Sequence, residues 1–174
     1  MTVLLKRFLP NDYVESIHNV TPEMLKQHNI KGVITDLDNT LVAWDEPDAT
    51  QEVIEWIQSL QSHDIQVVII SNNNEERVST FSSPLNVSFI SKARKPMQKA
   101  FNKARTDMGL NRNDVAVVGD QVLTDVFGGN RSKYYTILVV PIVKTDGFFT
   151  RFNRIVERRL LKYFRRKGYL HWED

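Results

Sequence analysis

The chain of 174 residues contains no cysteine, which excludes disulfide bonds and thiolate metal sites. It also lacks an apolar run near the ~20 residues that a bilayer-spanning helix needs, so we expect no transmembrane segment. The first ten residues have neither a long apolar core nor a small-residue cleavage site, which argues against a secretory signal peptide. These absences favour a cytoplasmic protein.

Charge is distributed unevenly along a composition that is otherwise ordinary for a globular domain. Residues 151–167 contain eight Lys or Arg against one acid, a local charge of +7, whereas the whole chain has a formal net charge of +2. The remainder is therefore acidic, at −5. We expect residues 1–147 to form a core with an N-terminal extension, and residues 148–174 to form a basic amphipathic C-terminal helix and tail of the same domain.

Short apolar runs alternate with helical patterns along the core. The runs that predict strands are 32–35, 65–70, 86–90, 115–118 and 136–140, and the patterns that predict helices are 48–63, 74–82, 96–108 and 123–131. This alternation indicates an α/β fold with a mainly parallel, five-stranded sheet covered by helices on both faces. In such sheets ligands bind at the carboxyl ends of the strands.

Polar residues stand at the carboxyl ends of three of these runs. Asp36 and Asp38 follow the first run, Ser71 follows the second, and Asp120 follows the run 115–118. Two carboxylates so close together repel each other, and a protein tolerates this when a cation or a reaction offsets the repulsion. Taken alone, each of these residues also fits a solvated turn or a strand-end cap. Together they predict one site at the edge of the sheet.

The order of four motifs carries a family resemblance. They are D-x-D-x-T from Asp36, Ser71, Lys95 before a proline, and G-D-x4-D from Gly119 to Asp125. This order resembles the haloacid dehalogenase (HAD) superfamily of phosphotransferases, which implies a Rossmannoid three-layer sandwich. The segments D-L-D-N-T-L, S-N-N, R-K-P, G-D-Q-x-x-T-D and G-G-N-R look like the class IIIA, YqeG-type phosphatases, a group similar to the mitochondrial phosphatidylglycerophosphate phosphatases. The resemblance implies conversion of phosphatidylglycerophosphate to phosphatidylglycerol in phospholipid synthesis.

Phosphoryl transfer needs a nucleophile, an acid for the leaving group and positive charge near the phosphoryl oxygens. We expect Asp36 to be the nucleophile that forms an aspartyl-phosphate, and Asp38 to act as general acid and then general base. A hard cation suits such an oxygen-rich site, and Mg²⁺ is expected, held by Asp36 and Asp120. The resemblance adds the backbone carbonyl of Asp38 as a third ligand.

The remaining motif residues are expected to bind the phosphate or to support the site. The Ser71 hydroxyl and the Asn72 N–H are placed to bind a phosphoryl oxygen, and Lys95 to neutralise charge on the phosphate and on the nucleophile. Thr40 is expected to orient its loop by hydrogen bonds. Asp125 either supports the metal ligands from behind or binds the metal directly.

The intervals between motifs leave no room for an inserted cap domain. Many HAD enzymes carry a cap between D-x-D and Ser or between Ser and Lys. Here these intervals are 32 and 23 residues, and the predicted helices and strands fill them. An uncapped site suits a phosphate on a large molecule, such as lipid, nucleic acid or protein, although a partner subunit could still serve as a lid.

The C-terminal segment has apolar residues at helical spacing with basic residues between them. The basic positions expected to contact a membrane are Arg151, Arg154, Arg158, Arg159, Lys162, Arg165 and Arg166. One interpretation is a helix that packs its apolar face on the domain. Another is a helix on the inner, anionic face of the membrane, which makes the protein peripheral. Both can hold together, and a third interpretation is binding to a nucleic-acid backbone.

Three functions are compatible with these features: a lipid phosphatase, a nucleic-acid or nucleotide phosphatase, and a non-catalytic RNA- or ribosome-associated factor. The intact set of site residues argues against the non-catalytic factor. Nucleic acid is the less favoured substrate because single-strand binders usually combine a basic groove with aromatic stacking residues, a combination that this sequence lacks.

Overall fold

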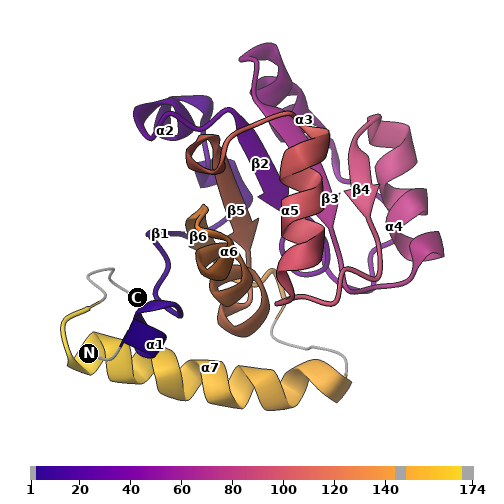
Figure 1. Cartoon of the computed structure of the whole chain (residues 1–174). Helices are drawn as coiled ribbons and strands as arrows, with labels where there is room; N and C mark the ends of the chain where they lie inside the picture. Colours follow the sequence, from indigo (N-terminus) through magenta and orange to yellow (C-terminus); the bar gives the residue numbers. More distant parts are fainter. Residues whose placement is uncertain (1–2, 144–147, 170–174) are drawn as a thin grey trace.

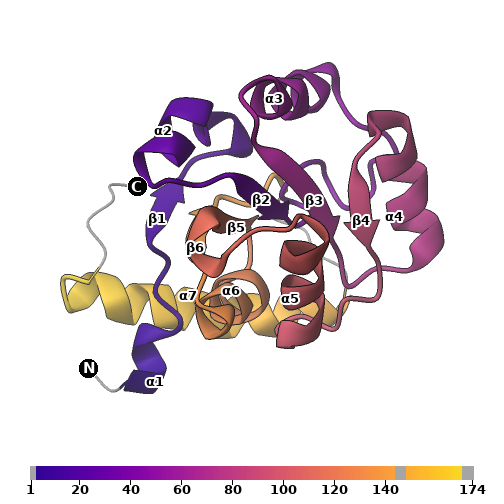
Figure 2. The ribbon, with the colours of Figure 1, turned by 45° about the horizontal axis from the view of Figure 1, so that its top comes forward.

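A computed structural model describes residues 3–143 and 148–169, with side chains over 4–143 and 155–169. A six-stranded sheet lies between two layers of helices (Figures 1 and 2). The strand order is β1-β6-β5-β2-β3-β4, and every neighbouring pair is parallel. The α/β three-layer fold that the sequence predicts is therefore confirmed.

The elements follow one another in strand–helix alternation. The strands are β1 (Asp12–Val14), β2 (Gly32–Thr35), β3 (Gln66–Ile70), β4 (Ser88–Ile90), β5 (Val115–Gly119) and β6 (Tyr135–Val139). The α-helices are α1 (Val3–Lys6), α2 (Pro22–Gln27), α3 (Gln51–Ser62), α4 (Glu75–Ser82), α5 (Gln98–Asp107), α6 (Phe127–Ser132) and α7 (Phe148–Arg166). Short helical turns are Ile17–Asn19, Ser83–Leu85 and Arg112–Asp114, and a π-helical segment, η4, covers Val122–Val126.

The core consists of two apolar layers, one on each face of the sheet. All residues of β2 and β5 are buried, which explains why these strands are continuous apolar runs and do not alternate. On one face α3 buries Val53, Trp56, Ile57 and Leu60. On the other face α5 buries Ala100, Phe101 and Ala104. Figure 2 shows α3 and α5 on opposite sides of the strands.

The prediction of five strands was wrong, because the N-terminal extension contributes a sixth. Strand β1 pairs with β6, with Tyr13 opposite Leu138. Its sequence, Asp-Tyr-Val, is three residues long and is not an apolar run, so the hydrophobic pattern does not predict a strand there. Hydrogen bonds across the pair hold it: Asn11 accepts from the backbone N–H of Thr136 at 2.9 Å and donates its own N–H to the Thr136 carbonyl at 2.9 Å.

The segment G-G-N-R, residues 128–131, anchors the same N-terminal extension. The side-chain amide of Asn130 donates to the carbonyl oxygens of Arg7 and Leu9 at 2.9 and 2.8 Å. The two glycines allow close packing, since a Cβ on Gly128 would lie 2.5 Å from the Phe101 ring and one on Gly129 would lie 2.6 Å from Thr136. The segment therefore has a structural role, joining α6 to the sheet and to the extension.

The intervals between the motifs contain only elements of the core. Helix α3 fills the first, and α4 with β4 fills the second. All residues from 36 to 95 are described, and among them there is no inserted domain. Helix α7 lies beyond the end of the sheet toward which the arrowheads of β2 and β5 point (Figure 1). Over the described ranges, no helix has both the length and the apolar character that a bilayer span requires.

Candidate active site

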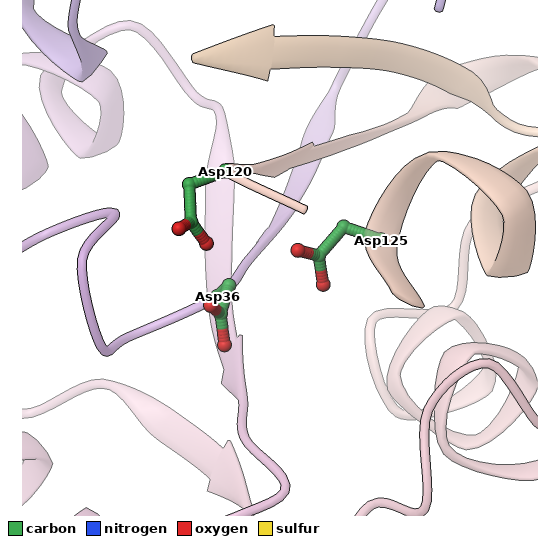
Figure 3. Close-up of side chains that lie close together, drawn as sticks. All are labelled: Asp36, Asp120 and Asp125. Carbon is green, nitrogen blue, oxygen red and sulfur yellow. The ribbon is translucent and has the colours of Figure 1, made fainter. Parts of the chain in front are cut away.

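Three neighbouring strands end at the same edge and bring the motif residues together. Strand β2 lies between β3 and β5, so Asp36, Ser71 and Asp120 follow adjacent strands. The backbone N–H of Asp36 donates to the Val118 carbonyl at 2.9 Å, which extends the pairing of β2 with β5 to Asp36. Figure 3 shows Asp36, Asp120 and Asp125 directed toward a common space.

Lys95 lies between two of these carboxylates. Its Nζ is 2.6 Å from Oδ1 of Asp36 and 2.7 Å from Oδ1 of Asp125, and all three side chains are buried. Burial alone lowers the pKa of Lys95, but the carboxylates of Asp125 and Asp36 raise it above its ordinary value. Burial raises the pKa of Asp125, against the lowering effect of Lys95. Because one ammonium faces two carboxylates, the proton stays on Lys95, which remains a cation.

The turn after β3 fixes the backbone of Lys95. The side-chain oxygen of Asn72 accepts from the Lys95 N–H at 2.7 Å, and the Asn72 amide donates to the Lys95 carbonyl at 3.4 Å. The Ser71 hydroxyl accepts from the N–H of Asn73 at 3.0 Å. The sequence assigned Asn72 only a backbone contact with phosphate, so the part that its side chain plays in placing Lys95 went unpredicted.

The acidic cluster offers the oxygen ligands of a metal site. One carboxylate oxygen from each of Asp36, Asp120 and Asp125 lies within 4.8 Å of the others. The Thr40 hydroxyl donates to Oδ1 of Asp120 at 3.2 Å, and Oδ2 of Asp125 accepts from the Gln121 N–H at 3.2 Å. These bonds orient two of the carboxylates from outside the cluster. A donor set made only of carboxylates fits Mg²⁺, which binds hard oxygen ligands.

The carboxyl group of Asp38 contacts the turn after β3 and the start of α4. Its Oδ1 accepts from Nε and Nη2 of Arg77, both at 3.2 Å, and its Oδ2 accepts from the Asn73 amide at 3.2 Å. The pKa of Asp38 is raised above its ordinary value. Burial is the main cause and the Asp36 charge adds to it, and together they outweigh the lowering effect of the Asn73 hydrogen bond. Arg77 was not singled out from the sequence, where it lies at an ordinary polar helix start. Asn73 entered only as the last residue of the S-N-N segment, with no role assigned.

Gly119 leaves room for the carboxyl group of Asp125 in the acidic cluster. A Cβ at position 119 would lie 2.4 Å from the carboxyl group of Asp125, a distance at which one of the two groups must move. We expect Gly119→Ala to displace the Asp125 carboxylate and, through it, Lys95. A displacement of about 1 Å near the reacting groups lowers kcat by about a hundredfold, which steady-state kinetics on a soluble phosphate ester would measure.

A double-mutant cycle tests whether the clash with Asp125 causes the loss of kcat expected in Gly119→Ala. If it is, Gly119→Ala in an Asp125→Ala background adds little further loss, because the clashing carboxyl group is already absent. Losses that simply multiply in the double variant would contradict this explanation.

Helix α7 docks beside the loop that carries Asp120 and Asp125. The carboxylate of Glu157, 3% exposed, accepts from the backbone N–H of Leu123 at 2.9 Å. Leu160 and Leu161 pack on the cluster formed by Val122, Val126 and Leu138, and Phe164 is fully buried. The four docked residues of α7 are spaced i, i+3, i+4 and i+7, which is one face of a helix. The interpretation that the helix packs on the domain therefore agrees with the structure.

The opposite face of α7 is exposed and basic. The exposed residues are Ile155, Val156, Arg158, Arg159, Lys162, Tyr163, Arg165 and Arg166. Ile155, Arg159, Lys162 and Arg166 are spaced i, i+4, i+7 and i+11 and form a stripe directly opposite the docked face. The side chains of Arg151 and Arg154, which were also expected to contact a membrane, lie outside the described residues.

Known proteins resemble this chain in sequence and in fold. The family model of the haloacid dehalogenase-like hydrolases matches residues 4–139. The chain is 58% identical over 172 residues to the probable phosphatase YqeG of Bacillus subtilis, covering 99% of this chain and 100% of that protein. It is 28% identical over 174 residues to phosphatidylglycerophosphate phosphatase 1, chloroplastic/mitochondrial, of Arabidopsis thaliana, covering 92% of this chain and 49% of that protein.

Solved structures share the fold at lower identity. The cobalt-bound deoxy-D-mannose-octulosonate 8-phosphate phosphatase of Haemophilus influenzae superposes with a TM-score of 0.56 and is 20% identical, covering 79% of this chain and 90% of that chain. At this identity the likeness concerns the fold alone.

Proposed function

The chain belongs to the haloacid dehalogenase-like hydrolase family, and we propose that this phosphatase acts on phosphatidylglycerophosphate at a membrane surface. The phosphatase activity follows from the family and from the YqeG relative. The lipid substrate is the further step, supported by the weaker similarity to the Arabidopsis phosphatidylglycerophosphate phosphatase and by the exposed basic stripe of α7.

In the proposed first step, a carboxylate oxygen of Asp36 attacks phosphorus and the bond from phosphorus to the ester oxygen breaks. The electron pair goes to the ester oxygen, which takes a proton from Asp38 and leaves as the alcohol. Lys95, 2.6 Å from Asp36, holds the nucleophile and places a positive charge beside the phosphoryl group. The hydroxyl of Ser71 stands on the adjacent strand end to bind a phosphoryl oxygen.

In the second step, water attacks the phosphorus of the aspartyl-phosphate and gives a proton to Asp38. The bond between phosphorus and the Asp36 oxygen breaks, which releases inorganic phosphate and restores the carboxylate. Asp36, Asp120 and the backbone carbonyl of Asp38 would hold Mg²⁺, which would supply positive charge beside the phosphoryl oxygens. Asp125 is assigned the supporting role, because both of its oxygens already have partners: Oδ1 pairs with Lys95 at 2.7 Å, and Oδ2 accepts from the Gln121 N–H at 3.2 Å.

The observation that carries the lipid proposal is the arrangement of α7. Its docked face contacts the loop that carries Asp120 and Asp125, through the bond between Glu157 and Leu123. Its exposed stripe presents Arg159, Lys162 and Arg166 to solvent. Exposed Val156 and Tyr163 add apolar surface beside these charges. A basic helix with exposed apolar side chains fits an anionic lipid surface, where each Lys or Arg contributes about 1 kcal/mol.

The function is tested by measuring phosphate release from three substrates in the presence of Mg²⁺. These are phosphatidylglycerophosphate in vesicles, a 3′-phosphorylated oligonucleotide and a small sugar phosphate. We expect the highest kcat/KM for the lipid, and loss of activity when EDTA removes Mg²⁺. A preference for the oligonucleotide would establish the nucleic-acid alternative, and full activity in EDTA would contradict the metal assignment.

The outer stripe of α7 gives a separate prediction about binding. Replacing Arg159, Lys162 and Arg166 with Gln removes three exposed charges and leaves the docked face intact. At about 1 kcal/mol for each charge, binding to anionic liposomes should weaken by roughly a hundredfold. Hydrolysis of soluble p-nitrophenyl phosphate should be unchanged. Liposome co-sedimentation measures the binding, and added salt should weaken it in the wild type as well.

The matched control removes three charges from the opposite edge of the sheet. Lys26, Lys31 and Arg112 are exposed there, and replacing them with Gln changes the net charge by the same amount. If both triple variants lost liposome binding equally, net charge alone would be responsible and α7 would not be the membrane contact. If the α7 variant lost binding to RNA but kept its binding to liposomes, the result would favour the nucleic-acid alternative.

A further inference from the structure

The carboxyl group of Asp38 is held at both of its oxygens by residues to which the sequence assigned no role. Arg77 donates two hydrogen bonds to Oδ1, and Asn73 donates one to Oδ2. The side chains of Asp38 and Arg77 are only 21% and 15% exposed. Because Arg77 holds one oxygen and Asn73 holds the other, the two residues together fix the carboxyl group in direction as well as in distance.

Arg77 is itself held in place by contacts on several sides. Its Nη1 donates to the carbonyl oxygen of Pro47 at 2.9 Å, and its guanidinium lies 5.7 Å from the centre of the Phe81 ring. Its backbone N–H donates to the side chain of Asn74, which caps α4. The guanidinium is therefore fixed between the loop after D-x-D and the start of α4, and cannot easily follow a moving carboxylate.

Asn73 joins the same arrangement to the phosphate-binding turn. Its amide reaches Asp38, and its backbone N–H donates to the Ser71 hydroxyl at 3.0 Å. The direction of the Asp38 carboxyl group is thus tied to the position of Ser71, the residue assigned to a phosphoryl oxygen.

We propose that Arg77 is a positioning residue that, together with Asn73, aims the carboxyl group of Asp38 at the ester oxygen of the substrate. This inference rests on the proposed function, in which one proton passes from Asp38 to the leaving oxygen and one returns from water. Arg77 exchanges no proton and touches no reacting atom. Its contribution is the direction in which that proton is delivered.

Poor positioning of the acid affects substrates unequally. An alkyl alcohol leaves as an unstable alkoxide unless it receives a proton, whereas p-nitrophenolate leaves readily without one. We therefore expect Arg77→Met to lower kcat/KM for glycerol 1-phosphate by about a hundredfold, and for p-nitrophenyl phosphate by less than about tenfold. The ratio kcat/KM reports steps up to phosphoryl transfer to Asp36, so slow hydrolysis of the intermediate does not disturb the comparison.

Two further variants separate positioning from folding. Arg77→Lys keeps the charge but loses the two-nitrogen contact, and we expect an intermediate loss with the same preference for the aryl ester. Arg112→Met removes an exposed arginine at the opposite edge and should leave both substrates unchanged. If Arg77→Met does not fold, as judged by its thermal unfolding, Arg77→Lys and Asn73→Ala carry the test.

If Arg77→Met lost kcat/KM equally on the two esters, or on neither, the inference would be overturned, because a purely structural role does not distinguish between leaving groups. Failure of the proposed function looks different: wild-type protein would then hydrolyse the two soluble esters but not phosphatidylglycerophosphate, and the comparison of the esters would still test Arg77. Selective loss on glycerol 1-phosphate, with p-nitrophenyl phosphate turnover largely retained, supports Arg77 as the residue that aims Asp38.

Discussion

Asp36→Asn should lower turnover of any phosphate ester by at least about a thousandfold. The amide that replaces the carboxylate is a poor nucleophile and is a weaker ligand for Mg²⁺. It also removes one of the two negative charges that Lys95 bridges at 2.6 and 2.7 Å, so Lys95 is left paired with Asp125 alone. Phosphate release at saturating substrate and Mg²⁺ measures the effect.

The control for this substitution is Asp107→Asn, which removes an exposed carboxylate whose partner is Lys103. It should retain wild-type turnover, because an exposed ion pair contributes little. Turnover near the wild-type value in Asp36→Asn, with the fold intact by circular dichroism, would rule out the aspartyl-phosphate mechanism.

Lys95→Met should destabilise the fold by about 3–5 kcal/mol, the cost of leaving a buried charge without its partner. Its ammonium contacts Asp36 and Asp125, and the three side chains are between 2% and 7% exposed. Removing the cation leaves two buried carboxylates that repel each other. Denaturant unfolding followed by circular dichroism measures the change, and turnover should fall as well because the phosphoryl group loses a positive neighbour.

Lys103→Met is the matched control, since Lys103 also pairs with a carboxylate, that of Asp107, at 2.6 Å. Its side chain is 60% exposed, so the same substitution there should cost only about 0–1 kcal/mol. Mg²⁺ should stabilise Lys95→Met more than the wild type, because the metal replaces the missing positive charge. Equal costs for the two lysines, or no difference in the effect of Mg²⁺, would contradict the assignment of Lys95 as the cation of the site.

The sequence predicted the edge of the sheet at which the site lies because long apolar runs fix the strands. Once β2, β3 and β5 are recognised, their carboxyl ends must hold Asp36, Ser71 and Asp120. The short strand β1 was not predicted, because three residues that include an Asp and a Tyr show no hydrophobic periodicity. Its pairing depends on Asn11 and Thr136, which are 125 positions apart.

Contacts made by single side chains were the least predictable part of the site. Arg77 reaches Asp38 across 39 positions, and Glu157 reaches Leu123 across 34. Neither belongs to a motif, and a charged residue on a helix is usually solvated. For α7 the apolar spacing indicated a docking face only in part, because Ile155, Val156 and Tyr163 are exposed. Glu157 gave no sign that it would be buried in that face.

The most direct test of the account is to locate the phosphoryl group on the enzyme. Asp38→Asn should slow hydrolysis of the intermediate, because the base that activates water is missing. Mixing this variant with p-nitrophenyl phosphate and Mg²⁺, quenching in acid and mapping peptides by mass spectrometry should find the phosphoryl group on Asp36. A phosphoryl group on another residue, or continued turnover of the variant with no phosphorylated peptide, would contradict the mechanism.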